Sequence, residues 1–138
     1  MLYFAGKVRR LRLLGVNDII LDPGFGFSKT VEQNYALMSR LREFGEFGLP
    51  LLVGVSRKSM IYKFLGGTPA DSLNGTTVLN TFALMNGADI LRVHDVRAAV
   101  EAVKIVNQLN NKTMWMNFGV KDLLMSCWWL SFYIRPIS

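Results

Sequence analysis

Three apolar runs of this sequence carry side chains that could act together on one ligand. Asp22 closes the first run, Lys58 follows the second, and Arg92 and His94 lie in the third. A carboxylate can accept two N–H bonds from a planar heterocycle, and cationic side chains bind phosphate oxygens. If the three runs are neighbouring strands, these residue types indicate one site for a heterocycle and a phosphate.

The segments on either side of Asp22 fix its expected position. The apolar, β-branched run Asn17–Leu21 predicts a buried parallel strand, and Pro23 cannot continue a central strand. Gly24 and Gly26 allow the backbone to turn sharply and to approach a ligand closely. We therefore expect Asp22 at the C-terminal end of a strand, where α/β proteins bind their ligands. The alternative is that Asp22 only caps the turn.

The second run, Pro50–Val55, leads into the polar segment Ser56–Ser59, where a helix is predicted to begin. Helix N-termini present free N–H groups to anions. The functional interpretation is a carboxylate or phosphate held by Ser59 and this helix end, with Lys58 alongside. The alternative is a charged loop that is simply solvated.

The third run, Asp89–Asp95, has a period of two. Arg92 and His94 alternate with Leu91 and Val93, so both polar side chains should point to the same side of the strand. A phosphate is the simplest reason for two such groups on one face. The alternative for His94 is a histidine whose hydrogen bonds are satisfied within the core.

The remaining pattern predicts helices between the strands. The order α-β-α-β-α-α-β-α indicates right-handed crossovers and a parallel sheet. We expect an α/β fold that is the C-terminal portion, about three βα units, of a (β/α)8 TIM barrel, which needs roughly 250 residues when whole. Residues 1–110 should form this unit. The tail, 111–138, holds all three tryptophans and is not expected to join the sheet. The helices are expected at Leu2–Leu14, from Thr30 in a capping box with Gln33, at Lys58–Leu65, at Asn74–Met85, and after Asp95 as N-cap.

Composition limits the functional classes. The 138 residues carry a net charge of +6 that is spread along the chain, which favours small anionic substrates over nucleic acid. The single cysteine, Cys127, allows no intrachain disulfide and predicts a cytoplasmic location. The apolar stretch Leu123–Ile134 is shorter than the ~20 residues of a membrane-spanning helix, so no membrane partner is expected.

Three motifs carry a family resemblance. Asp22–Lys29, Ser56–Met60 and Leu91–Val96 resemble, in residues, order and spacing, the C-terminal motifs of dihydropteroate synthase, and the likeness runs from about Tyr3 to Leu109. Members of this family are transferases of folate biosynthesis. They join p-aminobenzoate to 6-hydroxymethyl-7,8-dihydropterin pyrophosphate and release pyrophosphate. The resemblance also implies a homodimer, and a Mg²⁺ ion whose ligand is expected outside these motifs.

The resemblance assigns substrate-binding roles to single residues. Asp22 would hydrogen-bond the pterin ring, in a loop where Gly26 lets the backbone approach the substrates. Lys58 would contact the pterin and help to shape the p-aminobenzoate site. Phe27 would pack on the benzoate ring, and Ser59 would hold the benzoate carboxylate. Sulfonamides mimic p-aminobenzoate, so this site would also be their target.

Lys58, Arg92 and His94 are the expected catalytic residues. By resemblance, Arg92 and His94 would contact the pyrophosphate, and Arg92 would also stack beside the pterin. Departure of pyrophosphate builds negative charge on the leaving group, which fixed cations stabilise more in the transition state than in the ground state. The dihydropterin spreads the positive charge left behind, so no nucleophilic side chain is required. No metal ligand is expected among these residues.

Two other interpretations stay open at this point. The chain is expected to be inactive by itself if further pterin-binding residues of the family belong to the N-terminal half of the barrel. A half-barrel of this kind could instead serve as a non-catalytic binding or dimerisation module. Another pterin-binding barrel, such as a methyltetrahydrofolate methyltransferase domain, shares the pterin-binding carboxylate, although Ser56–Ser59 and the Arg92–His94 pair are not expected there.

Overall fold

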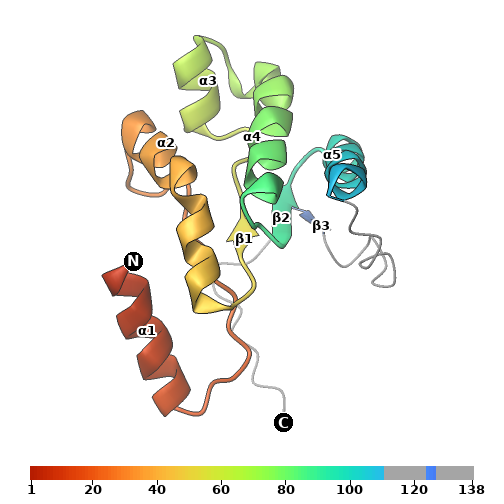
Figure 1. Ribbon diagram of the computed structural model, residues 1–138. Coiled ribbons are helices and arrows are strands. Elements are labelled where there is room, and N and C mark those ends of the chain that lie inside the picture. Colours follow the sequence, from red (N-terminus) through yellow and green to blue (C-terminus); the bar gives the residue numbers. More distant parts are fainter. Residues whose placement is uncertain (111–123, 127–138) are drawn as a thin grey trace.

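The computed structural model describes residues 1–110 and 124–126, in which helices alternate with short strands (Figure 1). This is the mixed α/β order that the sequence predicts. The strands are β1 (Leu52–Val53), β2 (Ile90–Val93) and β3 (Leu124–Ser126). The α-helices are α1 (Leu2–Leu13), α2 (Val31–Ser39), α3 (Ser59–Leu65), α4 (Leu73–Met85) and α5 (Val96–Leu109), and the 3-10 helices are η1 (Leu41–Phe47) and η2 (Pro69–Ser72).

The strands form one parallel sheet in the order β1-β2-β3. Leu52 pairs with Ile90 and Val53 with Leu91, which confirms the parallel pairing of the second and third apolar runs. Parallel neighbours bring their carboxyl ends to the same edge of the sheet. The residues that follow β1 therefore lie beside the residues at the end of β2.

The strand expected at Asn17–Leu21 is reduced to a single bridge between Leu21 and Leu51. The Leu21 N–H donates to the Pro50 carbonyl and the Leu52 N–H donates to the Leu21 carbonyl, both at 2.8 Å. The next ladder bonds on either side would need the N–H of Pro50 and of Pro23, and proline has none. Two prolines thus limit the ladder to one pair, while Asp22 still follows the paired residue.

The expectation that the tail stays out of the sheet is wrong for three residues. Leu124–Ser126 forms β3, which pairs in parallel with the second edge of β2. An open strand edge offers unpaired backbone groups to any short extended segment, and such pairing needs no side-chain periodicity. The rest of 111–138, including Cys127 and the tryptophans, lies outside the described residues.

Local signals placed the helices well. Thr30 begins α2 with the predicted capping box: its hydroxyl accepts the Gln33 N–H at 3.2 Å, and the Gln33 side chain accepts the Thr30 N–H at 2.9 Å. The helix then tightens into η1, which ends at Gly48 in a left-handed conformation with φ of +58°. No helix of the described residues is long and apolar enough to cross a membrane.

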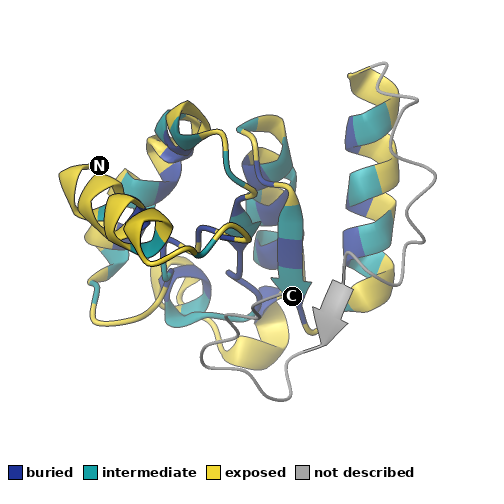
Figure 2. Ribbon diagram, turned by 90° about the horizontal axis from the view of Figure 1, so that it is seen from below, coloured by how far each residue is buried: buried dark blue, intermediate teal, exposed yellow. Residues whose placement is uncertain are grey.

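The core gathers around the strands, as the dark blue positions in Figure 2 show. In β2, Leu91 and Val93 are 0% and 1% exposed, whereas Arg92 between them is half-buried. This confirms the predicted period of two and puts Arg92 on the face opposite the two apolar side chains.

Helices α3 and α4 pack closely at Gly75. A Cβ at Gly75 would lie 2.5 Å from Cγ2 of the buried Ile61, so we expect Gly75→Ala to destabilise the fold by about 1–3 kcal/mol. Gly6→Ala in α1 is the matched control. Its Cβ would meet no described atom within 4 Å, so it should stabilise the fold by about 0.5–1 kcal/mol. Urea unfolding measures both, and equal effects would contradict this packing.

Candidate functional site

Asp22 is held in a defined orientation by the turn that follows it. Its Oδ1 accepts the Gly24 N–H at 2.8 Å, and Gly24 adopts a left-handed φ of +70°. Its Oδ2 lies 3.6 Å from Nη2 of Arg92. The Asp22 side chain is still 37% exposed, so the carboxylate keeps lone pairs available to a ligand. The turn-cap interpretation and the ligand interpretation are therefore compatible.

Arg92 reaches Asp22 by crossing β1 at a glycine. The chain after Val53 continues with Gly54, which faces Arg92 one step beyond the Val53–Leu91 pair. A Cβ at Gly54 would lie 2.9 Å from Nε and 3.0 Å from Nη2 of Arg92. A side chain at position 54 would thus displace the guanidinium. Sequence reasoning missed this role, because a glycine in a strand signals close approach without naming the neighbour.

The loop 22–30 is organised by a buried amide that sequence reasoning also missed. Asn34 is 1% exposed, and its side chain accepts the Gly26 N–H at 2.7 Å while donating to the Thr30 carbonyl at 2.7 Å. Lys29 folds back to donate to the Gly24 carbonyl at 2.8 Å. These contacts hold the loop in one shape. The sequence hints at a buried role for Asn34 only because this polar residue lies, one turn into α2, on a helix face that is otherwise apolar.

Lys58 joins this loop to the start of α3. Its Nζ donates to the Phe25 carbonyl and lies 4.7 Å from the centre of the Phe27 ring. Its aliphatic chain covers Gly26, where an added Cβ would lie 2.8 Å from Cδ of Lys58. The predicted residues Gly26, Phe27 and Lys58 therefore come together. Phe27 is 64% exposed, so much of its side chain is available to a ligand.

His94 is fixed by Ser56, which follows β1. The hydroxyl oxygen of Ser56 lies 3.1 Å from the His94 backbone nitrogen and 2.9 Å from its Nδ1. Ser56 is buried, whereas His94 is exposed. The histidine is therefore not the satisfied core residue considered above, because its ring lies at the surface at the end of β2. Ser59 is the half-buried first residue of α3.

Asp95 departs from its predicted role. It does precede α5, but its side chain makes no capping bond to that helix. Both of its oxygens instead accept from Arg57, at 2.9 and 2.6 Å. A bidentate guanidinium partner satisfies a carboxylate better than one backbone N–H. The hydrogen bonds from Arg57 hold the pKa of Asp95 below its usual value.

The Arg57–Asp95 pair should make the free energy of unfolding depend on pH in the acidic range. The pKa of Asp95 is lower in the folded state than in the unfolded state, so the ionised carboxylate stabilises the fold. This contribution to the free energy of unfolding is fully present above about pH 3.9, the usual aspartate pKa. It is lost as the pH falls through the lowered pKa of the folded state. We expect wild type to be more stable than Asp95→Asn near neutral pH, and the difference to shrink below about pH 4. Urea midpoints along a pH series test this. A difference that does not change with pH would contradict it.

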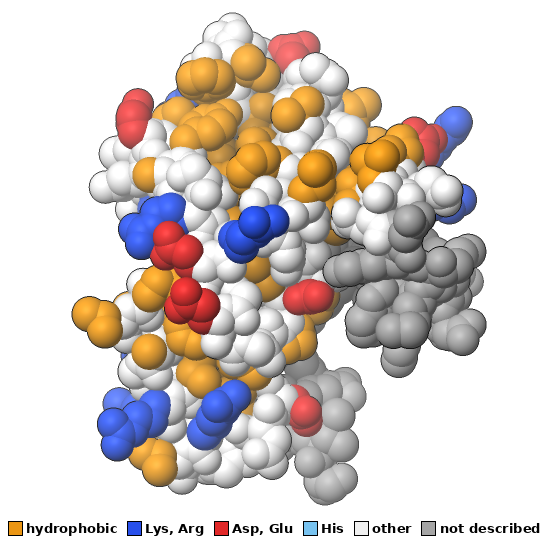
Figure 3. Space-filling view, in the orientation of Figure 1, with side chains coloured by type: hydrophobic (Ala, Val, Ile, Leu, Met, Phe, Trp, Pro, Cys, Tyr) orange, Lys and Arg blue, Asp and Glu red, His pale blue; other side chains and the backbone are white. Residues whose placement is uncertain are grey.

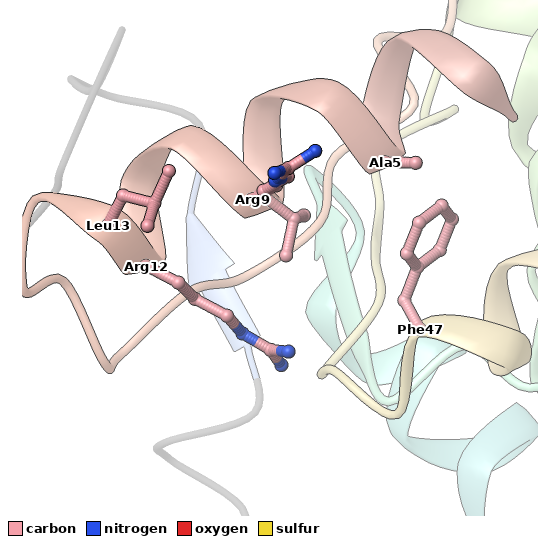
Figure 4. Close-up of a pocket in the computed structure, with 6 residues that line it drawn as sticks. Ala5, Arg9, Arg12, Leu13 and Phe47 are labelled. Atoms are coloured by element: carbon pink, nitrogen blue, oxygen red, sulfur yellow. The ribbon is translucent and has the colours of Figure 1, made fainter.

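Hollows in the described part of the chain also lie away from these residues. One, of about 410 Å³, lies between α1 and η1 and is lined by residues that include Arg9, Arg12 and Phe47 (Figure 4). The other is a groove of about 550 Å³ between α4 and α5. Neither is lined by a predicted site residue. Among the described residues, no group of three or more His, Cys, Asp or Glu side chains is placed to hold a metal ion.

Comparisons with known proteins agree with this arrangement. The family model described as "Pterin binding enzyme" matches residues 2–94. Dihydropteroate synthase of Escherichia coli K12 is 47% identical over 106 residues, which are 75% of this chain and 38% of that protein. The Synechocystis enzyme is 46% identical over 110 residues, 78% of this chain and 38% of that protein. The chain therefore spans about two fifths of the length of these relatives.

Solved structures give the same result. The crystal structure of Yersinia pestis dihydropteroate synthase superposes with a TM-score of 0.76 at 41% identity, and covers 79% of this chain and 52% of that one. The Thermus thermophilus enzyme in complex with 6HMPPP gives a TM-score of 0.71 at 44% identity, over 76% of this chain and 42% of that one.

Proposed function

This chain belongs to the family of pterin-binding enzymes, and we propose that its strand-end residues form part of the active site of a dihydropteroate synthase. In this proposal the chain is the C-terminal portion of a (β/α)8 barrel. The reaction joins p-aminobenzoate to 6-hydroxymethyl-7,8-dihydropterin pyrophosphate. The observation that carries the proposal is the partly exposed carboxylate of Asp22 beside the guanidinium of Arg92, which reaches it past Gly54 in the segment between them.

The Asp22–Arg92 pair suits a pterin next to a phosphate. The ring of a pterin presents adjacent N–H donors, and a carboxylate with free lone pairs accepts both. The 3.6 Å separation of the two side chains is longer than a hydrogen bond, so each keeps capacity for a ligand. Arg92 thereby offers a flat cation beside the ring and N–H groups to the pyrophosphate.

The reaction replaces a carbon–oxygen bond with a carbon–nitrogen bond. The bond between the pterin methylene carbon and the pyrophosphate oxygen breaks, and its electron pair leaves with pyrophosphate. The amine nitrogen of p-aminobenzoate then bonds to that carbon and releases a proton. In our proposal Arg92 and His94 bind the leaving group as its negative charge grows, and the ammonium group of Lys58 lies near the pterin.

The benzoate part of the site is proposed at Phe27 and Ser59. The exposure of Phe27, whose ring lies beside the ammonium group of Lys58, supports packing against an aromatic acid. Ser59 would bind the carboxylate through its hydroxyl. A Yersinia pestis relative was solved in a sulfonamide drug complex, and we propose that sulfonamides bind at the same residues here.

The described residues do not by themselves offer a full set of protein ligands for Mg²⁺, because no three or more His, Cys, Asp or Glu side chains gather among them. The expectation of Mg²⁺ stays a prediction from the family, and no step above depends on it.

Homodimer formation and a cytoplasmic location also stay predictions. Exposed apolar side chains support an interface on the outer helices: Figure 3 shows them gathered over the upper part of the molecule, above α3 and α4. Exposed apolar residues of these two helices include Phe64 of α3 and Val78 and Phe82 of α4. The alternative function, a non-catalytic dimerisation module, rests on this surface alone. The Escherichia coli and Synechocystis relatives favour the synthase over another pterin-binding barrel such as a methyltransferase domain.

Because the chain spans two fifths of its relatives, we propose that by itself it binds the pterin substrate without turning it over. Equilibrium dialysis with 6-hydroxymethyl-7,8-dihydropterin pyrophosphate, followed by a product assay with p-aminobenzoate, tests this. We expect retention of the pterin and no dihydropteroate. Product formation would overturn the proposed inactivity, and absence of retention would overturn the proposed site.

A further inference from the structure

Ser56 contacts His94 twice through one oxygen. Its hydroxyl oxygen accepts the backbone N–H of His94 at 3.1 Å and lies 2.9 Å from Nδ1 of the ring. Ser56 is only 4% exposed, so water competes little for this hydroxyl. A single buried side chain therefore fixes both the main chain and the ring of His94.

We propose that Ser56 is a positioning residue that makes Nε2 of His94 a permanent hydrogen-bond donor, an inference that rests on the proposed function of His94 as a pyrophosphate ligand. In this proposal the Ser56 oxygen, which already accepts the His94 backbone N–H, uses its O–H to donate to Nδ1 of the neutral ring, so that the ring proton resides on Nε2. In the cationic ring, Nδ1–H donates to the Ser56 oxygen and Nε2 also carries a proton. In both forms an N–H faces the exposed side, where a phosphate oxygen can accept it.

The neighbouring ion pair supports this positioning. Arg57 and Asp95 lie one residue beyond Ser56 and His94, so two adjacent pairs join the loop after β1 to the loop after β2. Arg57 has a left-handed φ of +53°, which a non-glycine residue keeps only when other contacts hold it. Its N–H donates to the buried Thr76 hydroxyl at 3.1 Å. The Arg57–Asp95 ion pair keeps the two loops in the register that Ser56 needs.

The experiment compares Ser56→Ala with Thr76→Val in the full chain. Each removes one buried hydroxyl beside this loop, but the Thr76 hydroxyl serves Arg57. His94 is the only histidine of the sequence, so its two ring ¹⁵N resonances are assigned without ambiguity. We expect wild type and Thr76→Val to show a protonated Nε2 and an unprotonated Nδ1. In Ser56→Ala both resonances should move toward values averaged between the tautomers.

A titration with inorganic pyrophosphate gives the functional readout. We expect Ser56→Ala to bind pyrophosphate about tenfold more weakly, the effect of losing one well-placed hydrogen bond, and Thr76→Val to bind within about twofold of wild type. Identical ring resonances in wild type and Ser56→Ala would overturn the positioning role. If the resonances differ but wild type binds no pyrophosphate, Ser56 still positions His94 and it is the proposed function that fails.

Discussion

Arg92→Ala should weaken the binding of inorganic pyrophosphate by about 10- to 100-fold. Charge-assisted hydrogen bonds are each worth about 1.5–3 kcal/mol, and the guanidinium of Arg92 lies 3.6 Å from Asp22, too far for a hydrogen bond that would compete with the anion. Isothermal titration of the variant and wild type measures the change. Unchanged affinity would remove Arg92 from the anion site.

Gly54→Ala gives an independent test of the position of Arg92, because the substitution keeps the guanidinium charge and displaces it. The added Cβ would lie 2.9 Å from Nε of Arg92, and the guanidinium, as the end of a flexible side chain, can swing away without disturbing the core. We expect a loss of pyrophosphate affinity in the same direction as in Arg92→Ala, with a small change in the free energy of unfolding. The control is Gly45→Ala, whose Cβ would meet no described atom within 4 Å.

Asp22→Asn should separate the two parts of the substrate. The amide offers one acceptor oxygen instead of two and carries no charge, so the affinity for the pterin part should fall by about 10- to 100-fold. Binding of inorganic pyrophosphate should change far less, since Arg92 remains. Titrations of the variant with a pterin lacking phosphate and with pyrophosphate measure the two effects. Equal losses for both ligands would mean that Asp22 only orients Arg92.

The sequence predicted those features that depend on local chemistry. The capping box at Thr30 and the alternation around Arg92 are both present, because each is determined by residues a few positions apart. The motifs that contain Asp22, Lys58 and Arg92 also lie at the same edge of the sheet, as predicted. The comparisons confirmed the family that those motifs indicated.

Features that depend on distant partners were not predictable in the same way. The short ladder at Leu21 depends on where Pro23 and Pro50 fall relative to the ladder bonds, and this requires the register. Asp95 was expected to cap a helix, but a bidentate partner 38 residues away takes its side chain. Likewise, Asn34 and Gly54 are recognisable only once their neighbours are in place.

We propose that Asp22, Lys58, Arg92 and His94 together form a binding site for a pterin pyrophosphate. A calorimetric titration of the purified chain with 6-hydroxymethyl-7,8-dihydropterin pyrophosphate in the presence of Mg²⁺, with Asp22→Ala in parallel, tests this most directly. We expect saturable binding at one site in the wild type and no such binding in Asp22→Ala. Absence of saturable binding by the wild type, or equal binding by Asp22→Ala, would contradict the proposed site.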